Sequence, residues 1–302
     1  MNSLHEQLGA QARPRQNRRA TAEPGWLKGA LIAILFLFVA FFLILPMTTV
    51  FLEAFSKGAG VVIDTFRDDA TLKAIELTLI VAAIAVPLNT LFGLAAAWSI
   101  AQFRFPGRNL LLILIDLPLW VSPVIGGLIY VLLFGRQGWL GPWLGDHDIK
   151  IIFALPGIVL GTTFVTFPFV ARNLIPLMET QGKAEEEAAL SLGAHGWQVF
   201  WRVTLPKVKW ALIYGVILCN ARAMGEFGAV SVVSGHIRGQ TNTMPLHVEI
   251  LYNEYHFAAA FAVAALLSVL AVITLGIKTL VEWRAARQQL ASQEIPTEGV
   301  SK

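Results

Sequence analysis

The sequence predicts an all-α integral membrane protein with six transmembrane helices. Hydrophobic residues make up 56% of the 302 residues and charged residues only 14%, against about 25% charged residues in an ordinary globular protein. The charges are also clustered, since neither Gly29–Leu52 nor Leu77–Phe103 contains one. Each of these stretches is longer than the about 20 apolar residues that a helix needs to cross a bilayer. This composition excludes a soluble enzyme and leaves no room for a large domain outside the membrane.

The six expected spans follow one another as runs of apolar residues. The first is too long for a signal-peptide core and follows a mostly polar stretch, so we expect an uncleaved anchor. Prolines at 118, 123, 156 and 168 are expected to interrupt the third and fourth spans, which would suit a gate. The expected spans are 30–50, 74–100, 110–134, 152–177, 210–233 and 257–278.

The distribution of Lys and Arg orients these spans. With the N-terminus inside, the inner segments hold 16 of the 23 basic residues and the outer segments hold 6, while Arg222 lies within a span. Cytoplasmic loops of membrane proteins are enriched in basic residues, so we expect a bacterial inner-membrane protein with both termini in the cytoplasm. The expected division is a cytoplasmic tail (1–28), the first helix with a periplasmic loop (29–70), a core of five spans (71–279) and a second cytoplasmic tail (280–302).

No pattern in the sequence indicates chemistry within this chain. The net charge of +3 reflects the basic loops of a membrane protein and does not indicate nucleic-acid binding. The six histidines and the single cysteine, Cys219, show no metal-ligand spacing. Gly182-Lys183 lacks the upstream glycine, the following Ser or Thr and the preceding strand of a phosphate-binding loop. We therefore expect no catalytic residue, metal or cofactor here, and energy has to come from another subunit.

The longest inner connection has the pattern of a short helical hairpin. Lys183–Leu192 contains strong helix formers with acidic residues in the first turns, where the helix dipole favours them. Gly193 suits the left-handed position after a helix. A second helix from about Trp197 places three aromatic residues on one face, and Pro206 is expected to end it before the fifth span. The residues alone fit either an amphipathic hairpin at the membrane surface or a docking surface for a cytoplasmic partner.

The hairpin resembles a motif of the permease subunits of ABC importers. Glu187-Ala188-Ala189 is followed after three residues by Gly193 and after nine more by Val203-Thr204-Leu205-Pro206. This is the spacing of the EAA motif, with Val203 where the family often has isoleucine. The resemblance covers about 71–279 and implies the type I ABC importer permease fold, with coupling helices at about 183–206 seated on an ATPase subunit. The residues that it assigns to ATPase coupling are Glu187, Ala188, Ala189, Gly193, Val203, Leu205 and Pro206.

Two further stretches are similar to permeases of sulfate/thiosulfate importers. They are Phe105-Pro-Gly-Arg108 and Asn220–Gly235. Molybdate permeases share much of the second stretch, whereas Val230–Gly239 looks more like the W-type permease subunit of the sulfate branch than like its T-type partner. The resemblance implies sulfate/thiosulfate import, with a molybdate/tungstate permease as the alternative. It also implies two ATPase subunits that hold ATP-Mg, a second homologous permease and a periplasmic sulfate/thiosulfate-binding protein, all at the lipid bilayer.

Ionisable residues at membrane depth are functional candidates, because burying them unpaired is costly. Arg222 and Glu226 lie four residues apart on one helix face. Either Arg222 meets the anion in transit, or the two residues neutralise each other and fix helix packing, which is the favoured interpretation. Asp116 is a further candidate partner for Arg222. Hydroxyl and amide side chains are also candidates for the path, although bonding within their own helix is the simpler role. These side chains are Ser122, Thr162, Thr163, Thr166, Asn220, Ser231 and Ser234.

Two other classes of membrane protein compete with this interpretation. An ion-coupled secondary anion transporter would act alone, but no second half of the chain repeats the first and the intramembrane charges are few. A membrane-bound enzyme would need a cluster of titratable groups at one depth, which the sequence does not show. The hairpin distinguishes these classes, since only a permease that is driven by an ATPase subunit depends on it.

Overall fold

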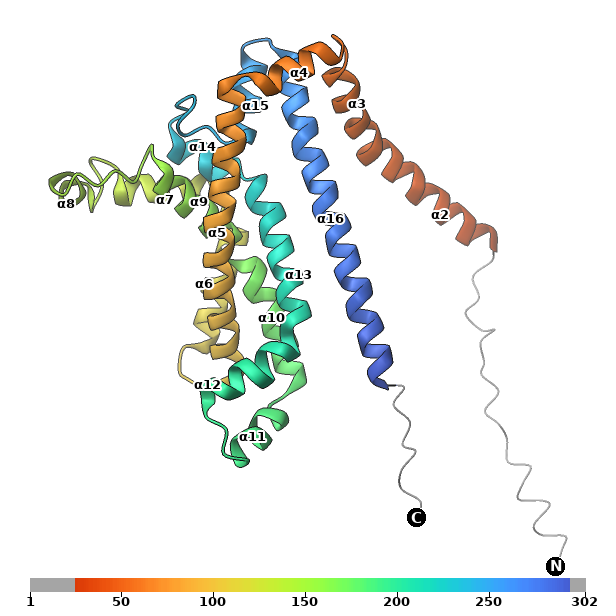
Figure 1. Cartoon of the computed structure of the whole chain (residues 1–302), viewed down its shortest axis with the longest axis vertical. Coiled ribbons are helices and arrows are strands. Elements are labelled where there is room, and N and C mark those ends of the chain that lie inside the picture. The colour runs from red at the N-terminus through yellow and green to blue at the C-terminus, as the bar shows by residue number, and fades with distance from the viewer. Residues whose placement is uncertain (1–24, 294–302) are drawn as a thin grey trace, which may run out of the picture. The chain divides into compact units, whose positions relative to one another are not determined.

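The computed structural model describes residues 25–293, and this part of the chain is helical with no strand (Figure 1). The expected tail residues 1–24 and 294–302 lie outside the described residues. The chain divides into two compact units, Met1–Thr49 and Val50–Lys302, which are described separately. Within the described range, 4 helices are long and apolar enough to cross a membrane, or up to 6 if each bent pair is one span. The all-α membrane class is therefore confirmed.

The described part of the first unit, residues 25–49, lies in one continuous helical segment. α2 (Gly25–Val39) passes through a π-helical turn, η1 (Ala40–Ile44), into α3 (Leu45–Ala54), whose last residues belong to the second unit. No side chain of α2 or η1 is buried. A helix that is this apolar and that packs against no protein requires hydrocarbon around it. It covers the first expected span and begins earlier than predicted.

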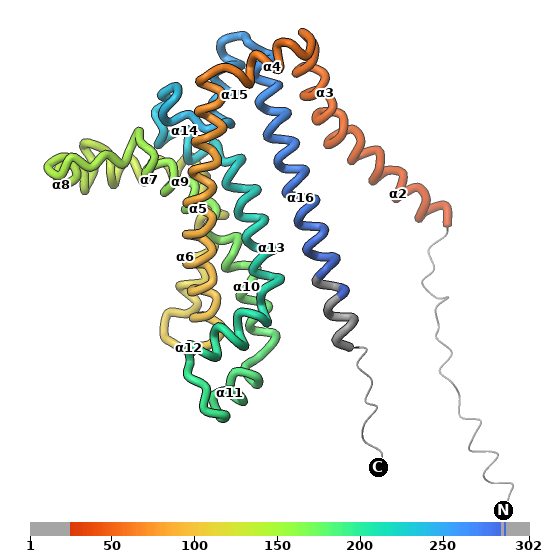
Figure 2. The backbone as a smooth tube through the Cα atoms, viewed as in Figure 1, coloured from red at the N-terminus to blue at the C-terminus, as the bar shows by residue number. Residues whose placement is uncertain are grey.

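The second unit contains the other helices. Figure 2 traces α5 from end to end beside α10 and α13, and all three pack against one another. We call the end of this unit that carries α11 and α12 the hairpin end; α4 and α15 lie at the opposite end (Figure 1). The helices are α4 (Ala59–Arg67), α5 (Asp69–Gln102), α6 (Arg108–Trp120), α7 (Pro123–Phe134), α8 (Gly141–Asp146), α9 (Leu155–Thr166), α10 (Pro168–Gln181), α11 (Ala184–Ser191), α12 (Gly196–Val199), the π-helix η2 (Phe200–Thr204), α13 (Leu205–Met224), α14 (Gly228–Ser234), α15 (Met244–Asn253) and α16 (Phe257–Gln293).

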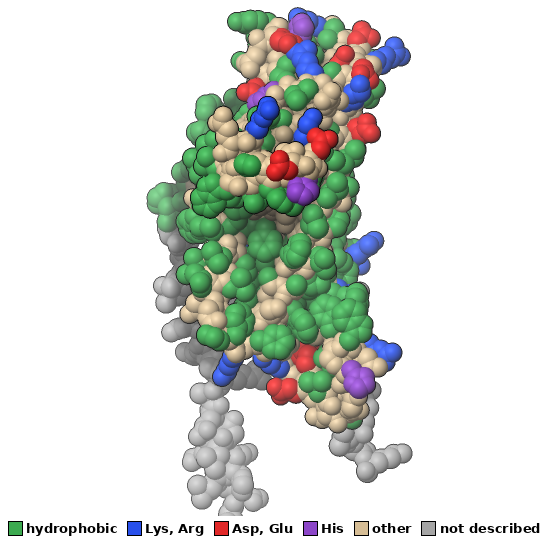
Figure 3. Space-filling view, turned by 90° about the vertical axis from the view of Figure 1, so that its left-hand side faces the viewer, with side chains coloured by type: hydrophobic (Ala, Val, Ile, Leu, Met, Phe, Trp, Pro, Cys, Tyr) green, Lys and Arg blue, Asp and Glu red, His purple; other side chains and the backbone are tan. Residues whose placement is uncertain are grey.

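One face of the protein carries its charges mainly at two levels. On the face shown in Figure 3, Lys, Arg, Asp and Glu side chains gather at both ends, and a broad apolar band separates them. Hydrocarbon tolerates apolar side chains and excludes unpaired charges, so this band is the part expected to lie in the bilayer. Large apolar side chains such as Leu91 of α5 and Leu132 of α7 are 64% and 69% exposed.

Three of the expected spans are interrupted. α6 and α7 are bent by 108° and α13 and α14 by 51°, while α9 and α10 meet at Phe167 within one span. Pro123 and Pro168 stand in the first turns of α7 and α10, where their missing N–H costs nothing and where they restrict the residue before them. Pro123 and Pro168 thus stand at the interruptions of the third and fourth spans, as predicted, whereas Pro118 lies inside α6 without breaking it and Pro156 stands in the first turn of α9. The third span is thereby two helices at a sharp angle rather than one rod.

Buried apolar side chains form two clusters on either side of these interruptions. The hairpin-side cluster joins α5, α6, α10 and α13 and includes Ile100 and Leu174. The α15-side cluster joins α5, α9, α14 and α15 and includes Ile158 and Val233. Along α9–α10 and along α13–α14 the chain passes from one cluster to the other through buried polar side chains, which are Thr162 and Thr166 in the first case and Glu226 in the second. Asn89 of α5 donates to Thr166 at the same level. None of these four side chains is more than 1% exposed.

Two glycines allow the close packing of α5, α10 and α13 around Val170. A Cβ atom added to Gly93 would lie 2.8 Å from Val170 Cβ, and one added to Gly215 would lie 3.2 Å from Val170 Cα. Neither position could hold a larger residue without moving a backbone. Small residues at helix crossings are the usual means of association in membranes, where no hydrophobic effect drives helices together.

One predicted helix end is wrong, and the last helix is longer than its expected span. Pro206 does not end the second hairpin helix, because α12 continues through η2 into α13. In the wide π turn the N–H of Leu205 bonds to Phe200 O, which places Pro206 in the first turn of the next α-helical segment, where proline is tolerated. In addition, α16 continues to Gln293, so the described part of the expected C-terminal tail is helical.

At the end opposite the hairpin, α5 is fastened to α15 by polar contacts. Thr71 Oγ1 lies 3.0 Å from His247 Nε2, and the N–H of Met244 donates to Thr78 Oγ1 over 2.8 Å. Thr71 also donates its N–H to the N-cap residue Asp68 over 3.0 Å. His247 is only 2% exposed, so a charge on its ring would be buried.

Acidification is expected to loosen this contact. Burial lowers the pKa of His247, the nearby Arg238 lowers it further, and Asp68 and Glu254 only partly oppose them. Because the unfolded chain then binds more protons below the ordinary pKa of about 6.5, stability is complete above that pH and falls as the pH decreases through it. We expect the Tm of the purified protein in detergent to fall from pH about 7 to about 5, and His247→Gln to flatten this fall. The control is His256→Gln, which removes an exposed imidazole and leaves the contact between Thr71 and His247 in place. A pH profile of His247→Gln that equals the profile of this control would contradict the prediction.

Candidate functional site

The predicted helical hairpin forms between α10 and α13. α11 carries three glutamates in its first turn, and Gly193 follows it with a φ of 87°, as predicted for the left-handed residue after a helix. Gly182, directly before the hairpin, has a φ of 67°. Left-handed glycines at both ends of α11 therefore set its direction relative to α10 and α12.

The residues of the EAA motif divide between the surface and the interior of the hairpin. The exposed members are available to another protein, while the others face the helices that support the hairpin. The exposed residues are Glu187, Ala188, Gly193 and Pro206, and the half-buried ones are Ala189, Val203 and Leu205.

The carboxylate that holds the hairpin together is not the one in the motif. Glu186 is 7% exposed, and its Oε1 accepts a hydrogen bond from Thr204 Oγ1 over 3.4 Å. Lys207 adds an ion pair with Glu185 over 3.4 Å. The EAA motif singles out only Glu187, because three successive glutamates do not reveal from the sequence which one points inward.

An apolar tip completes the exposed surface of the hairpin. Leu192 is 89% exposed and Trp197 is 71% exposed. Behind them, Phe200 contacts Trp197, Trp201 and Trp98 of α5 with ring centroids 6.0, 5.6 and 5.2 Å away. A supported apolar tip bordered by carboxylates is typical of a surface that another protein covers. Of the two interpretations that the residues left open, this geometry favours docking.

Arg222 and Glu226 form an ion pair at the break between α13 and α14. Arg222 Nη1 lies 2.7 Å from Glu226 Oε2, and Glu226 Oε1 accepts the N–H of Ala229 over 2.9 Å. The side chain of Glu226 has no exposure, whereas that of Arg222 is 35% exposed. Both carboxylate oxygens are thus engaged, one on the cation and one on the first turn of α14. Asp116, the other candidate partner, makes no ion pair among the described residues.

The hydroxyl and amide candidates separate into engaged and free groups. Ser231 donates to Gly228 O within its own helix over 2.9 Å, and Ser234 accepts the N–H of His236 over 3.1 Å. Asn220 contacts only Met224 Sδ, at 3.6 Å. Most of these side chains therefore bond locally.

Thr162, Thr163 and Thr166 lie in the last turns of α9. Thr166 donates to Thr162 O and accepts from Asn89 Nδ2 of α5, each over 2.7 Å. The hydroxyls of Thr162 and Thr163 have no partner in the described part of the chain. Sequence reasoning missed Asn89, although an amide within an apolar span is a signal that could have found it. In the same part of the chain, no group of three or more His, Cys, Asp or Glu side chains could hold a metal ion.

Comparison with known proteins assigns this geometry to a family. The family described as “Binding-protein-dependent transport system inner membrane component” matches residues 89–287, which include the hairpin, the α13–α14 break and the last part of α5, from Asn89 onward. The chain belongs to this family of transport permeases. It is accordingly an inner-membrane component of a transport system that has further components.

Individual members of the family show which permeases this chain is similar to. The chain is 51% identical over 280 residues to “Sulfate transport system permease protein CysW” of Escherichia coli (strain K12), and the match covers 92% of this chain and 96% of that protein. The CysW protein of Synechococcus elongatus is 54% identical over 259 residues, with coverage of 86% and 91%. “Sulfate transport system permease protein CysT” of Escherichia coli (strain K12) is 36% identical over 231 residues, with coverage of 76% and 83%. The predicted likeness to the W-type subunit is confirmed.

Solved structures agree on the fold of the permease. A chain of a bacterial alginate ABC transporter, in complex with an alginate-bound periplasmic protein, superposes with a TM-score of 0.70 at 18% identity, covering 87% of this chain and 94% of that chain. A second alginate importer structure gives a TM-score of 0.69. The predicted ABC importer permease fold is confirmed.

Removing one member of the Arg222–Glu226 pair is expected to destabilise the permease more than removing both. Arg222→Met leaves a buried carboxylate without its counter-ion, which costs up to about 3–5 kcal/mol in a fully buried pair and less here because Arg222 is partly exposed. In the double variant with Glu226→Gln, the amide oxygen still accepts the Ala229 N–H and no charge remains. Thermal unfolding in detergent should rank the double variant above Arg222→Met.

The control for this comparison is Arg238→Met, which removes an exposed ion pair with Glu254 and should change the Tm little. Uptake is measured on the same variants. A double variant less stable than Arg222→Met would refute the pairing interpretation, and a stable Arg222→Met that has lost uptake would favour contact between Arg222 and the anion.

Proposed function

We propose that the chain is the permease subunit of an ATP-driven sulfate/thiosulfate importer. The observation that carries the proposal is the 51% identity over 280 residues to a CysW sulfate permease, which extends over 92% of this chain. The lower identity to a CysT protein supports the W-type position in the assembly. A molybdate/tungstate permease is the alternative substrate assignment, and the uptake experiment below separates the two.

The proposed mechanism divides the work between subunits. Two ATPase subunits hold ATP-Mg, a second, homologous permease completes the path, and a periplasmic binding protein delivers the anion. The chain itself holds no cofactor and catalyses no bond chemistry. When ATP brings the ATPase subunits together, the hairpin moves and the path opens alternately on its two sides. The exposed motif residues Glu187, Ala188 and Gly193, beside the apolar tip, support this role of the hairpin.

In this proposal the hairpin and both termini lie in the cytoplasm, and α15 lies on the periplasmic side. The 16 to 6 excess of basic residues on the hairpin side supports this orientation. For the path itself, neutral donors suit a dianion better than an unpaired cation, which would hold it too long. Thr162 and Thr163 support such a path, because their hydroxyls lack protein partners.

Reconstituted transport tests the substrate. Membrane vesicles holding this chain with its candidate partners are expected to take up labelled sulfate only with ATP, and thiosulfate should compete more strongly than molybdate. The control is the same preparation without this chain. Uptake that persists without the chain would remove the assignment, stronger competition by molybdate would favour the alternative substrate, and uptake without ATP would favour a secondary transporter.

Substitutions in the hairpin test the coupling. Glu187→Lys reverses a charge on the exposed surface, and Gly193→Asp places a side chain at a φ of 87°, which is costly for most residues. Each is expected to abolish uptake at normal membrane levels. Gly196→Ala is the matched control, because this exposed glycine has no positive φ and open space around it. A transporter that acts alone would be indifferent to all three changes.

A further inference from the structure

The hairpin end of α5 carries a set of contacts that the EAA motif does not include. The last carbonyl groups of a helix lack partners within the helix. At the end of α5, Arg108 Nε donates to Ile100 O over 3.1 Å, and Lys183 Nζ donates to Gln102 O. Cations at this position are favoured by the helix dipole. Two basic side chains thus complete the end of α5.

These two side chains come from different places in the chain. Arg108 begins α6, while Lys183 stands directly before α11 and is therefore the first residue of the hairpin. Arg108 also forms an ion pair with Glu179 in the last turns of α10. The hairpin is consequently fastened to α5 on both sides of Gly182, the left-handed residue between α10 and α11. We call Arg108, Glu179 and Lys183 the α5 clamp.

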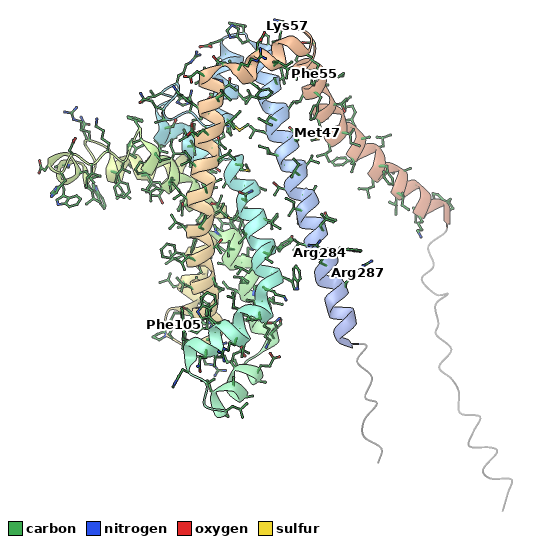
Figure 4. All side chains as sticks on the ribbon, in the orientation of Figure 1. Met47, Phe55, Lys57, Phe105, Arg284 and Arg287 are labelled. Atoms are coloured by element: carbon green, nitrogen blue, oxygen red, sulfur yellow. The ribbon has the colours of Figure 1, made fainter. Side chains whose placement is uncertain are left out.

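The clamp borders an open hollow at the surface rather than lying in a packed interior. It lines a hollow of about 930 Å³ together with Arg104, Phe105 and Glu187 of the motif. Figure 4 shows Phe105 at the end of α5 that adjoins α12. The side chains of Arg108 and Glu179 are 33% and 41% exposed, and exposed ion pairs contribute about 0–1 kcal/mol to folding stability. The clamp residues therefore act mainly by fixing the position of the hairpin relative to the end of α5.

The clamp holds the end of α5, which runs unbroken through the packed core of the second unit. α5 remains one helix although it contains Pro87, whereas the neighbouring segments are interrupted. Its other end is fastened to α15 through Thr71, Thr78 and His247. A displacement of the hairpin that reaches α5 is delivered along a rigid helix to the opposite end of the unit.

We propose that Lys183 and Arg108 are positioning residues of the coupling mechanism. Through the α5 clamp, α5 moves together with the hairpin and transmits its displacement to α15. This inference rests on the proposed function, in which an ATPase subunit drives the hairpin. Together with the ring contact between Phe200 and Trp98 of α5, the clamp joins the hairpin to α5. Among the described residues, no exposed motif residue is joined to α5 by a hydrogen bond or ion pair.

A distance measurement in the assembled transporter tests the clamp directly. Spin labels are placed on cysteines introduced at Ser191 of α11 and Leu91 of α5, both exposed, while Cys219 is fully buried and stays unlabelled. The wild-type distance distribution should be narrow and unchanged by ATP, because the two helices move together. Lys183→Met with Arg108→Met should broaden it. Lys183→Arg should preserve it, since a guanidinium can also donate to the Gln102 carbonyl.

Arg104→Met is the matched control. Arg104 lines the same hollow and carries the same charge, but no hydrogen bond or ion pair of its side chain occurs among the described contacts. In proteoliposomes we expect the double clamp variant to keep ATP hydrolysis while sulfate moved per ATP falls about tenfold. Arg104→Met should match the wild type in both measurements.

The outcomes separate the clamp from the proposed function. A wild-type distance distribution in the double clamp variant would overturn the inference, and so would an equal effect of Arg104→Met, which would assign the effect to the charge of the hollow. If the wild-type assembly moves no sulfate, the substrate assignment fails, but the ATP-dependent distance measurement still decides whether the clamp joins α5 to the hairpin.

Discussion

Backbone groups that lose their helical partners within a bilayer must find others, since each unsatisfied group in hydrocarbon costs several kcal/mol. This constraint governs the second unit, which interrupts its spans between α6 and α7, between α9 and α10 and between α13 and α14. At the last of these breaks Glu226 accepts the N–H of Ala229 and pairs with Arg222. Glu226, which the sequence makes a candidate for the translocation path, thus stabilises the break between α13 and α14.

The interruptions also explain how the core is divided. Two apolar clusters pack on either side of a layer of buried polar side chains, in which Asn89 of α5 donates to Thr166 of α9. Segments that are broken at this layer can change their angles there without remaking either cluster. α5 crosses the polar layer as one unbroken helix. The second unit therefore combines segments that can bend at this layer with one rigid helix that connects its two sides.

Much of the fold follows from short-range rules that the sequence displays. Runs without charge locate the spans, prolines at 123 and 168 locate two interruptions, and Gly193 marks the end of α11. The prediction that Pro206 ends a helix failed because a π-helical turn before it shifts the hydrogen-bond register. Residue preferences do not encode such a turn. The site was less predictable, since its contacts join distant residues. Asn89 and Thr166 are 77 positions apart and Arg108 and Glu179 are 71 apart, and Glu186 differs from Glu187 only in the direction that it faces.

The exposed tip of the hairpin has a consequence for the life of the protein in the cell. Leu192 and Trp197 are 89% and 71% exposed, and in the proposed importer they lie in the cytoplasm rather than in lipid. A permease made without its ATPase subunits would present this apolar surface to water, where such patches promote aggregation and attract quality-control proteases. The permease then avoids degradation only if its ATPase subunits are produced in matching amounts. The uncovered docking surface is the feature by which proteases would recognise an unassembled permease.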